Sequence, residues 1–140
     1  MKSEFRIEYR IMNSKTNKIQ NFTDLHTWQE GHKLVLMIYK ETEKFPDKEK
    51  YGIIDQMRRA AVSITSNIAE GFTRESSKEK GRFYCIAQGS LVELQNQLII
   101  SCDVGYLSNS EFQTIIDQTV ISSKLLSGLL KATKNKLFES

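Results

Sequence analysis

The periodic spacing of apolar residues, which begins at Thr23 and continues almost to the C-terminus, most constrains the fold of this chain. Apolar side chains recur there every three or four residues, which is the spacing of an α-helix with one buried face. The 140 residues include one proline, Pro46, and seven glycines, too few for a sandwich or barrel with many tight turns. We therefore predict an all-α fold.

Four helices follow from this pattern and its interruptions. We expect them at about residues 24–43, 47–70, 77–104 and 109–136, with Asp47 as the N-cap of the second. Long helices joined by short connections predict an antiparallel up-down-up-down four-helix bundle. The chain then consists of one bundle domain, residues 23–140, preceded by a short extension, residues 1–22.

Several helix ends carry their own signals. Ser76 with Glu79, and Ser108 with Glu111, have the S-x-x-E spacing of a capping box, in which each side chain bonds to the other residue's backbone N–H. They predict the starts of the third and fourth helices. Gly71 follows the second helical pattern, where a left-handed C-cap residue is needed. We therefore expect the second helix to end there.

The predicted helices carry more apolar surface than one core stripe requires, because such a stripe uses only three or four positions per two turns. The inner faces expected for the first three helices are Leu25, Trp28, Val35, Ile38 and Tyr39; Ile53, Met57, Ala60, Ala61, Ile64 and Ile68; and Phe83, Ala87, Leu91, Leu94 and Leu98. Residues 34–38 are also apolar without a break, and the fourth helix has adjacent apolar pairs at 115–116, 120–121, 125–126 and 129–130. We expect a homo-oligomer whose copies cover this surplus; the alternative is a wide monomeric core.

The extension differs from the bundle in pattern and charge. Residues 4–11 alternate polar and apolar side chains, as a β-strand does, and such a strand needs a partner. It can pair with another copy, lie against the bundle or have no fixed structure. The first 22 residues contain five basic and two acidic residues, whereas the remainder contains fifteen of each. Binding of nucleic acid by the bundle therefore requires a local basic patch.

The stretch from Arg58 to Gly71 combines small and polar side chains on one helix. Ser63, Ser66, Asn67 and Glu70 follow at intervals of three and four residues, which places them on neighbouring parts of one face. One interpretation is polar contact between closely packed helices. The alternative is a ligand or partner site.

Three segments carry a resemblance to a known family: "FPDKEKYGIIDQMRRAAVSITSNIAEG", "RESSKEKGRFYCIAQGSLVELQNQL" and "GYL". They resemble the bacterial four-helix-bundle proteins encoded in intervening sequences of 23S ribosomal RNA genes, and the related accessory variability proteins of diversity-generating retroelements. The resemblance covers residues 22 to about 132. It implies a non-enzymatic bundle that forms a barrel-like homopentamer, with nucleic-acid or reverse-transcriptase contacts in the retroelement branch.

A basic surface on the second and third helices is the candidate site for such contacts. Its residues are Arg58, Arg59, Arg74, Lys78 and Arg82, which an antiparallel hairpin is expected to bring onto one surface. The protein would then bind RNA or a nucleoprotein; the alternative is a homo-oligomeric interaction scaffold in which these residues form intersubunit salt bridges. Phe83 is in phase with the core stripe, whereas Tyr84 is offset and open to either role.

No pattern indicates catalysis, a metal or a cofactor. His26 and His32 are six residues apart, about 240° around a helix, and so do not share a face. No phosphate-binding glycine motif is present, and the carboxylate pairs lie among lysines. Cys85 and Cys102, about 25 Å apart along one predicted helix, cannot form a disulfide. Free thiols and the lack of a long apolar run predict a cytoplasmic protein without membrane contact. The lack of catalytic motifs predicts a non-enzymatic protein without a small-molecule substrate.

Overall fold

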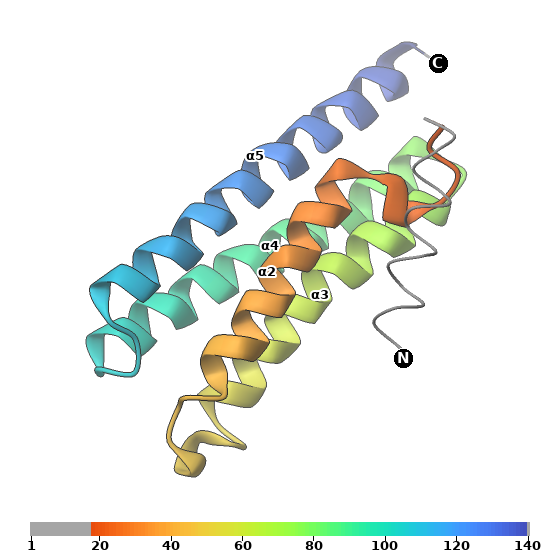
Figure 1. The fold of residues 1–140 in the computed structure, drawn as a ribbon. Helices are drawn as coiled ribbons and strands as arrows, with labels where there is room; N and C mark the ends of the chain where they lie inside the picture. Colours follow the sequence, from red (N-terminus) through yellow and green to blue (C-terminus); the bar gives the residue numbers. More distant parts are fainter. Residues whose placement is uncertain (1–17, 140) are drawn as a thin grey trace.

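The computed structural model describes residues 18–139, which form four long helices packed as an antiparallel bundle (Figure 1). The helices are α2 (His26–Thr42), α3 (Ile53–Thr73), α4 (Ser77–Asp103) and α5 (Asn109–Glu139), with single 3-10 turns η1 (Phe22–Asp24) and η2 (Asp47–Glu49). Helix α3 packs against α2 and α4, and α5 packs against α4 and α2, so that the four helices surround one core. The predicted all-α bundle is confirmed, and the described residues contain no strand. The alternating segment, residues 4–11, lies outside the described residues.

The core consists of the inner faces of all four helices. Its fully buried members are Leu34, Ile38, Met57, Ala61, Ile64, Ile68, Ala87, Leu91, Leu94, Leu98, Ile115 and Leu126. Most of the predicted inner stripes are confirmed, but Leu25, Val35 and Ile53 are only partly buried and Tyr39 is 42 % exposed. Tyr39 lies outside because Leu34 and Ile38 occupy the inward positions of α2.

The connection between α2 and α3 is longer than the sequence predicts. Asp47 begins the separate turn η2 instead of capping α3, which starts at Ile53 after Gly52. The segment folds back on the α4–α5 turn: the Phe45 ring lies 5.3 Å from that of Tyr106, whose hydroxyl donates a 2.7 Å hydrogen bond to Glu49. These contacts hold residues 45–49 off the axis of α3.

The serine N-caps predicted for the last two helices are both present. Ser76 Oγ accepts a 3.1 Å hydrogen bond from the Glu79 N–H. Ser108 and Glu111 form the full reciprocal box, with distances of 2.8 and 3.0 Å. The Ser108 backbone and hydroxyl donors lower the pKa of the Glu111 carboxyl. Both predicted serines therefore begin helices, but at Ser76 only half of the box forms, because the Glu79 carboxylate pairs with Arg82.

The left-handed glycine is Gly105, not Gly71. Gly105 has φ +91° and ends α4, whereas Gly71 is buried inside α3 and has no positive φ. A Cβ on Gly71 would lie only 2.5 Å from Cε1 of Tyr84, so the missing side chain admits the tyrosine ring. Lys80 performs the capping instead, because its ammonium donates to the carbonyl oxygens of Phe72 (2.7 Å) and Gly71 (3.3 Å).

The bundle covers only part of the apolar surplus. Within residues 34–38, Leu34 and Ile38 are fully buried and Val35 and Met37 are partly buried, but Leu36 is 54 % exposed. On α5, Val120 and Ile121 are both exposed. None of the helices described in residues 18–139 is long and apolar enough to cross a membrane.

We predict that Gly71→Ala destabilises the fold although alanine is the better helix former. The new Cβ meets the Tyr84 ring, and overpacking of this kind costs about 1–3 kcal/mol. Gly89→Ala is the matched control, because the Cβ there has no neighbour within 4 Å and the free energy of unfolding should rise by up to about 1 kcal/mol. Urea unfolding measures both variants, and a Gly71→Ala protein as stable as Gly89→Ala would contradict the steric account.

Candidate functional site

The polar residues of α3 divide between a helix contact and the surface. The hydroxyls of Ser63 and Ser90 lie 2.7 Å apart and join α3 to α4. Asn67 donates to the backbone oxygen of Ser63 (2.8 Å) and to its hydroxyl (3.1 Å). Ser63 and Asn67 thus hydrogen-bond within the α3–α4 contact, whereas Ser66 and Glu70 are exposed.

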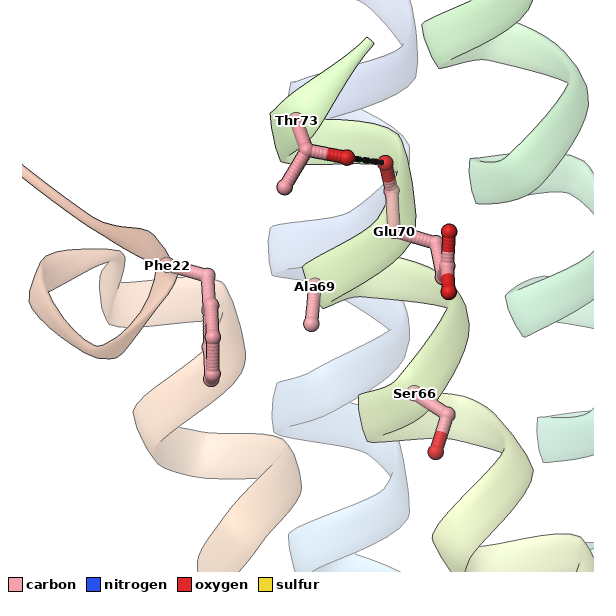
Figure 2. Close-up of a pocket in the computed structure, with 5 residues that line it drawn as sticks. All are labelled: Phe22, Ser66, Ala69, Glu70 and Thr73. Atoms are coloured by element: carbon pink, nitrogen blue, oxygen red, sulfur yellow. Dashed lines mark hydrogen bonds between the residues drawn. The ribbon is translucent and has the colours of Figure 1, made fainter.

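Ser66 and Glu70 line a shallow hollow of about 310 Å³ between η1 and the end of α3 (Figure 2). Phe22, Ala69 and Thr73 complete its lining. The Thr73 hydroxyl donates a 2.7 Å hydrogen bond to the Glu70 carbonyl oxygen, and the Glu70 carboxylate pairs with Arg74 at 2.9 Å. The lining thus combines one aromatic ring, two hydroxyls, a methyl group and a carboxylate that is already paired with Arg74.

Arg58 is bound to the C-terminal end of α2. Its Nε donates a 2.9 Å hydrogen bond to the buried Thr42 hydroxyl, a second nitrogen lies 3.4 Å from the Tyr39 carbonyl oxygen, and the guanidinium lies 4.6 Å from the centre of the Tyr39 ring. A cation in this position stabilises the carbonyl end of a helix. Its neighbour Arg59 is exposed and pairs with Asp55 at 3.1 Å.

Arg74 and Arg82 both lie against the ring of Phe83. Each guanidinium is 4.7 Å from the centre of the phenyl ring. Arg82 also pairs with Glu79 at 3.2 Å. The prediction that Phe83 belongs to the core stripe was wrong, because Phe83 is only partly buried. The adjacent Tyr84 is buried against Gly71 instead, and burial raises the pKa of its hydroxyl.

The five predicted basic residues do not share one surface. The contacts of Tyr84 with Gly71, Ser90 with Ser63, and Ser101 with Met57 fix the antiparallel alignment of α4 and α3. Arg58 therefore lies beside the end of α4, and sixteen residues, roughly 24 Å of helix, separate it from Arg74. Arg74, Lys78 and Arg82 lie together at the other end of the bundle.

Lysines of α5 add to that end, which sequence reasoning missed. Gln95 donates to Thr119 (3.0 Å) and Gln88 to Ser127 (3.3 Å), so the last turns of α5 lie beside the first turns of α4. We call the resulting surface the basic end: Arg74, Lys78, Lys80, Arg82, Lys131, Lys134 and Lys136. The pKa of Lys80 is lowered by burial and by the charge of Lys136. A sequence signal existed, because four lysines and no acidic residue lie between Asp117 and Glu139.

The lysines of the basic end differ from its arginines in their partners. Arg74 and Arg82 each have a carboxylate partner. Among the residues that the structure describes, Lys78, Lys131, Lys134 and Lys136 form no ion pair and all four are exposed. At the opposite end, residues 40–50 alternate four lysines with four acidic residues. Lys40, Lys48 and Lys50 there also form no ion pair with the described residues, but the four acidic residues balance the charge of the segment. The net positive charge is therefore concentrated at the basic end.

The described part of the chain contains no cluster of three or more histidine, cysteine or carboxylate side chains that could hold a metal ion. The His32 ring stacks on Trp28 with centroids 4.8 Å apart. The Glu30 carboxylate pairs with Lys33 at 2.7 Å, and this contact is the main cause that lowers the pKa of Glu30. Cys85 and Cys102 are free thiols.

The fold and the basic end define an all-α four-helix-bundle protein with charge segregated along the bundle. Residues 23–128 match the family described as 23S rRNA-intervening sequence protein, and the chain belongs to this family. A crystal structure of a protein of unknown function from the S23 ribosomal protein family of Bacteroides thetaiotaomicron has a similar fold, with TM-score 0.68 and 19 % identity, over 75 % of this chain and 98 % of the other. Comparison with curated proteins gives no match.

We predict that Arg58 and Arg59 respond differently to alanine substitution. Arg58→Ala removes the hydrogen bond that Arg58 donates to the buried Thr42 hydroxyl, and it removes the packing on Tyr39. The free energy of unfolding should fall by about 1–2 kcal/mol. Arg59→Ala, which breaks one exposed pair, should change it by less than about 0.5 kcal/mol. Thermal or urea unfolding gives both values. Equal losses would contradict the structural role of Arg58.

Proposed function

We propose that this protein is a non-catalytic binding protein that holds RNA through its phosphates at the basic end. The observation that supports the proposal is the group of four exposed lysines, Lys78, Lys131, Lys134 and Lys136, that have no carboxylate partner among the described residues. An exposed lysine that pairs with no carboxylate gives up few protein contacts when it binds phosphate. The release of counterions from the nucleic acid then favours binding.

Electrostatics further favours this end of the molecule. The pKa of Lys80 is lowered first by burial and then by the charge of Lys136, and the second effect is that of positive charges that lie close together. Phosphate contacts from such a group carry no sequence information by themselves. Arg74 and Arg82 would contribute by exchanging their glutamates for phosphate, whereas Arg58 and Arg59 lie too far away to take part.

The α5 lysines should determine RNA affinity. The triple variant Lys131→Gln, Lys134→Gln, Lys136→Gln should bind a fluorescent single-stranded RNA more weakly, and the slope of log affinity against log salt should fall by about 2, because each phosphate contact to a single strand contributes about 0.7. Fluorescence anisotropy over a salt series measures both quantities.

The matched control is the triple variant Lys40→Gln, Lys48→Gln, Lys50→Gln at the opposite end, which removes the same charge from a segment that alternates with carboxylates. It should keep most of the affinity and of the slope. Equal effects of the two triple variants would show that net charge alone governs binding, and no measurable RNA binding by the wild-type protein would refute the proposal.

A second candidate function is a homo-oligomeric interaction scaffold, which the exposed apolar side chains on the α4–α5 seam favour. Val92 is 63 % exposed, Ile99 49 % and Val120 40 %. Gln95 of α4 donates to Thr119 of α5. Val92 lies three residues before Gln95 and Ile99 four residues after it, and Val120 directly follows Thr119. These three residues therefore follow one seam on the surface. A second copy would cover this apolar strip, and assembly would bring several basic ends together.

If the scaffold forms, light scattering should give a mass that is a multiple of 16.2 kDa, and Ile99→Lys should reduce it to the monomer. Tyr51→Lys is the control, because Tyr51 is 87 % exposed but lies in the α2–α3 connection. It should leave the mass unchanged. A wild-type monomer at tens of micromolar would refute self-association.

A further inference from the structure

A groove lies within the basic end, between α4 and the last turns of α5. Its volume is about 430 Å³, within the range of small-ligand sites. Gln88 lines it from α4, and Ser127, Leu130, Lys131, Lys134 and Asn135 line it from α5. The groove is therefore continuous with the lysines to which we assign phosphate binding.

The lining combines three kinds of chemistry. Leu130, only 7 % exposed, is a nearly buried apolar side chain that contributes to the wall of the groove. Gln88 and Asn135 contribute amides, and Lys131 and Lys134 contribute ammonium groups three residues apart on one side of α5. A ligand that uses all three needs a flat apolar part, a hydrogen-bonding edge and a nearby negative charge.

The amides have hydrogen-bonding capacity to spare. The only hydrogen bond that Gln88 makes with its side chain among the described residues is the long 3.3 Å donation to Ser127. The Asn135 side chain makes none with them and is exposed. Each amide can present a donor and an acceptor side by side, which is the pattern that glutamine and asparagine use to bind the edge of a nucleobase.

A nucleotide fits this lining better than a simple anion. Inorganic phosphate would use the lysines but neither the leucine nor the amides. A base attached to a phosphate uses all of them: its face packs on Leu130 and the lysine stems, and its edge meets the amides. The base must be unpaired, because in an RNA duplex its faces are covered by stacked neighbours and its major-groove edge lies in a groove too narrow for side chains.

We propose that the groove lined by Gln88, Leu130 and Asn135 holds one unpaired base of a single-stranded RNA whose phosphates lie on Lys131 and Lys134. This inference rests on the proposed function and adds base contact to it. It assigns contact with the edge of the base to the amides of Gln88 and Asn135.

The test compares two RNA strands and two double variants. The probes are a fluorescent single strand of about 12 nucleotides, within the usual range of single-strand site sizes, and the same strand with abasic residues throughout. The groove variant is Gln88→Ala with Asn135→Ala. The control is Gln95→Ala with Asn96→Ala, because Gln95 bridges α4 to α5 by the same kind of hydrogen bond outside the groove, and Asn96 is an exposed amide.

The wild-type protein and the control should bind the intact strand about 5-fold or more tightly than the abasic strand. The groove variant should bind the two strands equally, with its helical circular dichroism unchanged. The inference is overturned if the wild-type protein does not distinguish the strands, or if the groove variant still does; phosphate binding by the basic end would survive either result. Failure of the wild-type protein to bind both strands would overturn the inference and the proposed function together.

Discussion

The contact of Tyr84 with Gly71 determines the arrangement of one whole end of the bundle. Because Gly71 has no side chain, the tyrosine ring occupies the space between α3 and α4 and is nearly completely buried. Burial of Tyr84 sets the rotation of α4 about its axis. Phe83 then lies at the edge of the core, where the guanidinium groups of Arg74 and Arg82 contact its ring. Lys80 is brought over the last carbonyl oxygens of α3.

This arrangement explains an electrostatic conflict that the sequence presents. Cations in the first turns of a helix oppose its dipole, and α4 begins with Lys78, Lys80 and Arg82. In an antiparallel hairpin the start of α4 lies beside the end of α3, where a cation is favourable. Lys80 thus stabilises the neighbouring helix, and Glu79 pairs with Arg82. The lysines of α5 lie at the same place because α5 also ends there, so the composition and net charge of the whole chain do not indicate the basic end.

Local signals in the sequence predicted the fold well and the site less well. The helix number, the antiparallel order and both S-x-x-E starts depend on neighbouring residues and were correct. The C-cap prediction for Gly71 and the core position of Phe83 were wrong, and the contact of Arg58 with α2 was missed, because these roles depend on another helix: Gly71 on a ring from α4, and Arg58 on a hydroxyl of α2. Phe83 and Tyr84 are adjacent aromatic residues, and only the glycine opposite decides which one is buried. The α5 lysines are visible in the sequence as a run without carboxylates, but their position beside the first turns of α4 depends on contacts between the two helices.

The hydrogen bonds from α4 to both of its neighbours have a consequence for how the bundle tolerates change. Ser90 meets Ser63 of α3, while Gln88 and Gln95 meet hydroxyls of α5. A slide of α4 by one helical turn, about 5.4 Å, would separate all three pairs at once. Exchange of exposed side chains on α4 therefore leaves the axial position of the helix unaltered, and the exposed thiol of Cys85 provides an attachment point for a spectroscopic label on a helix held in place from two sides.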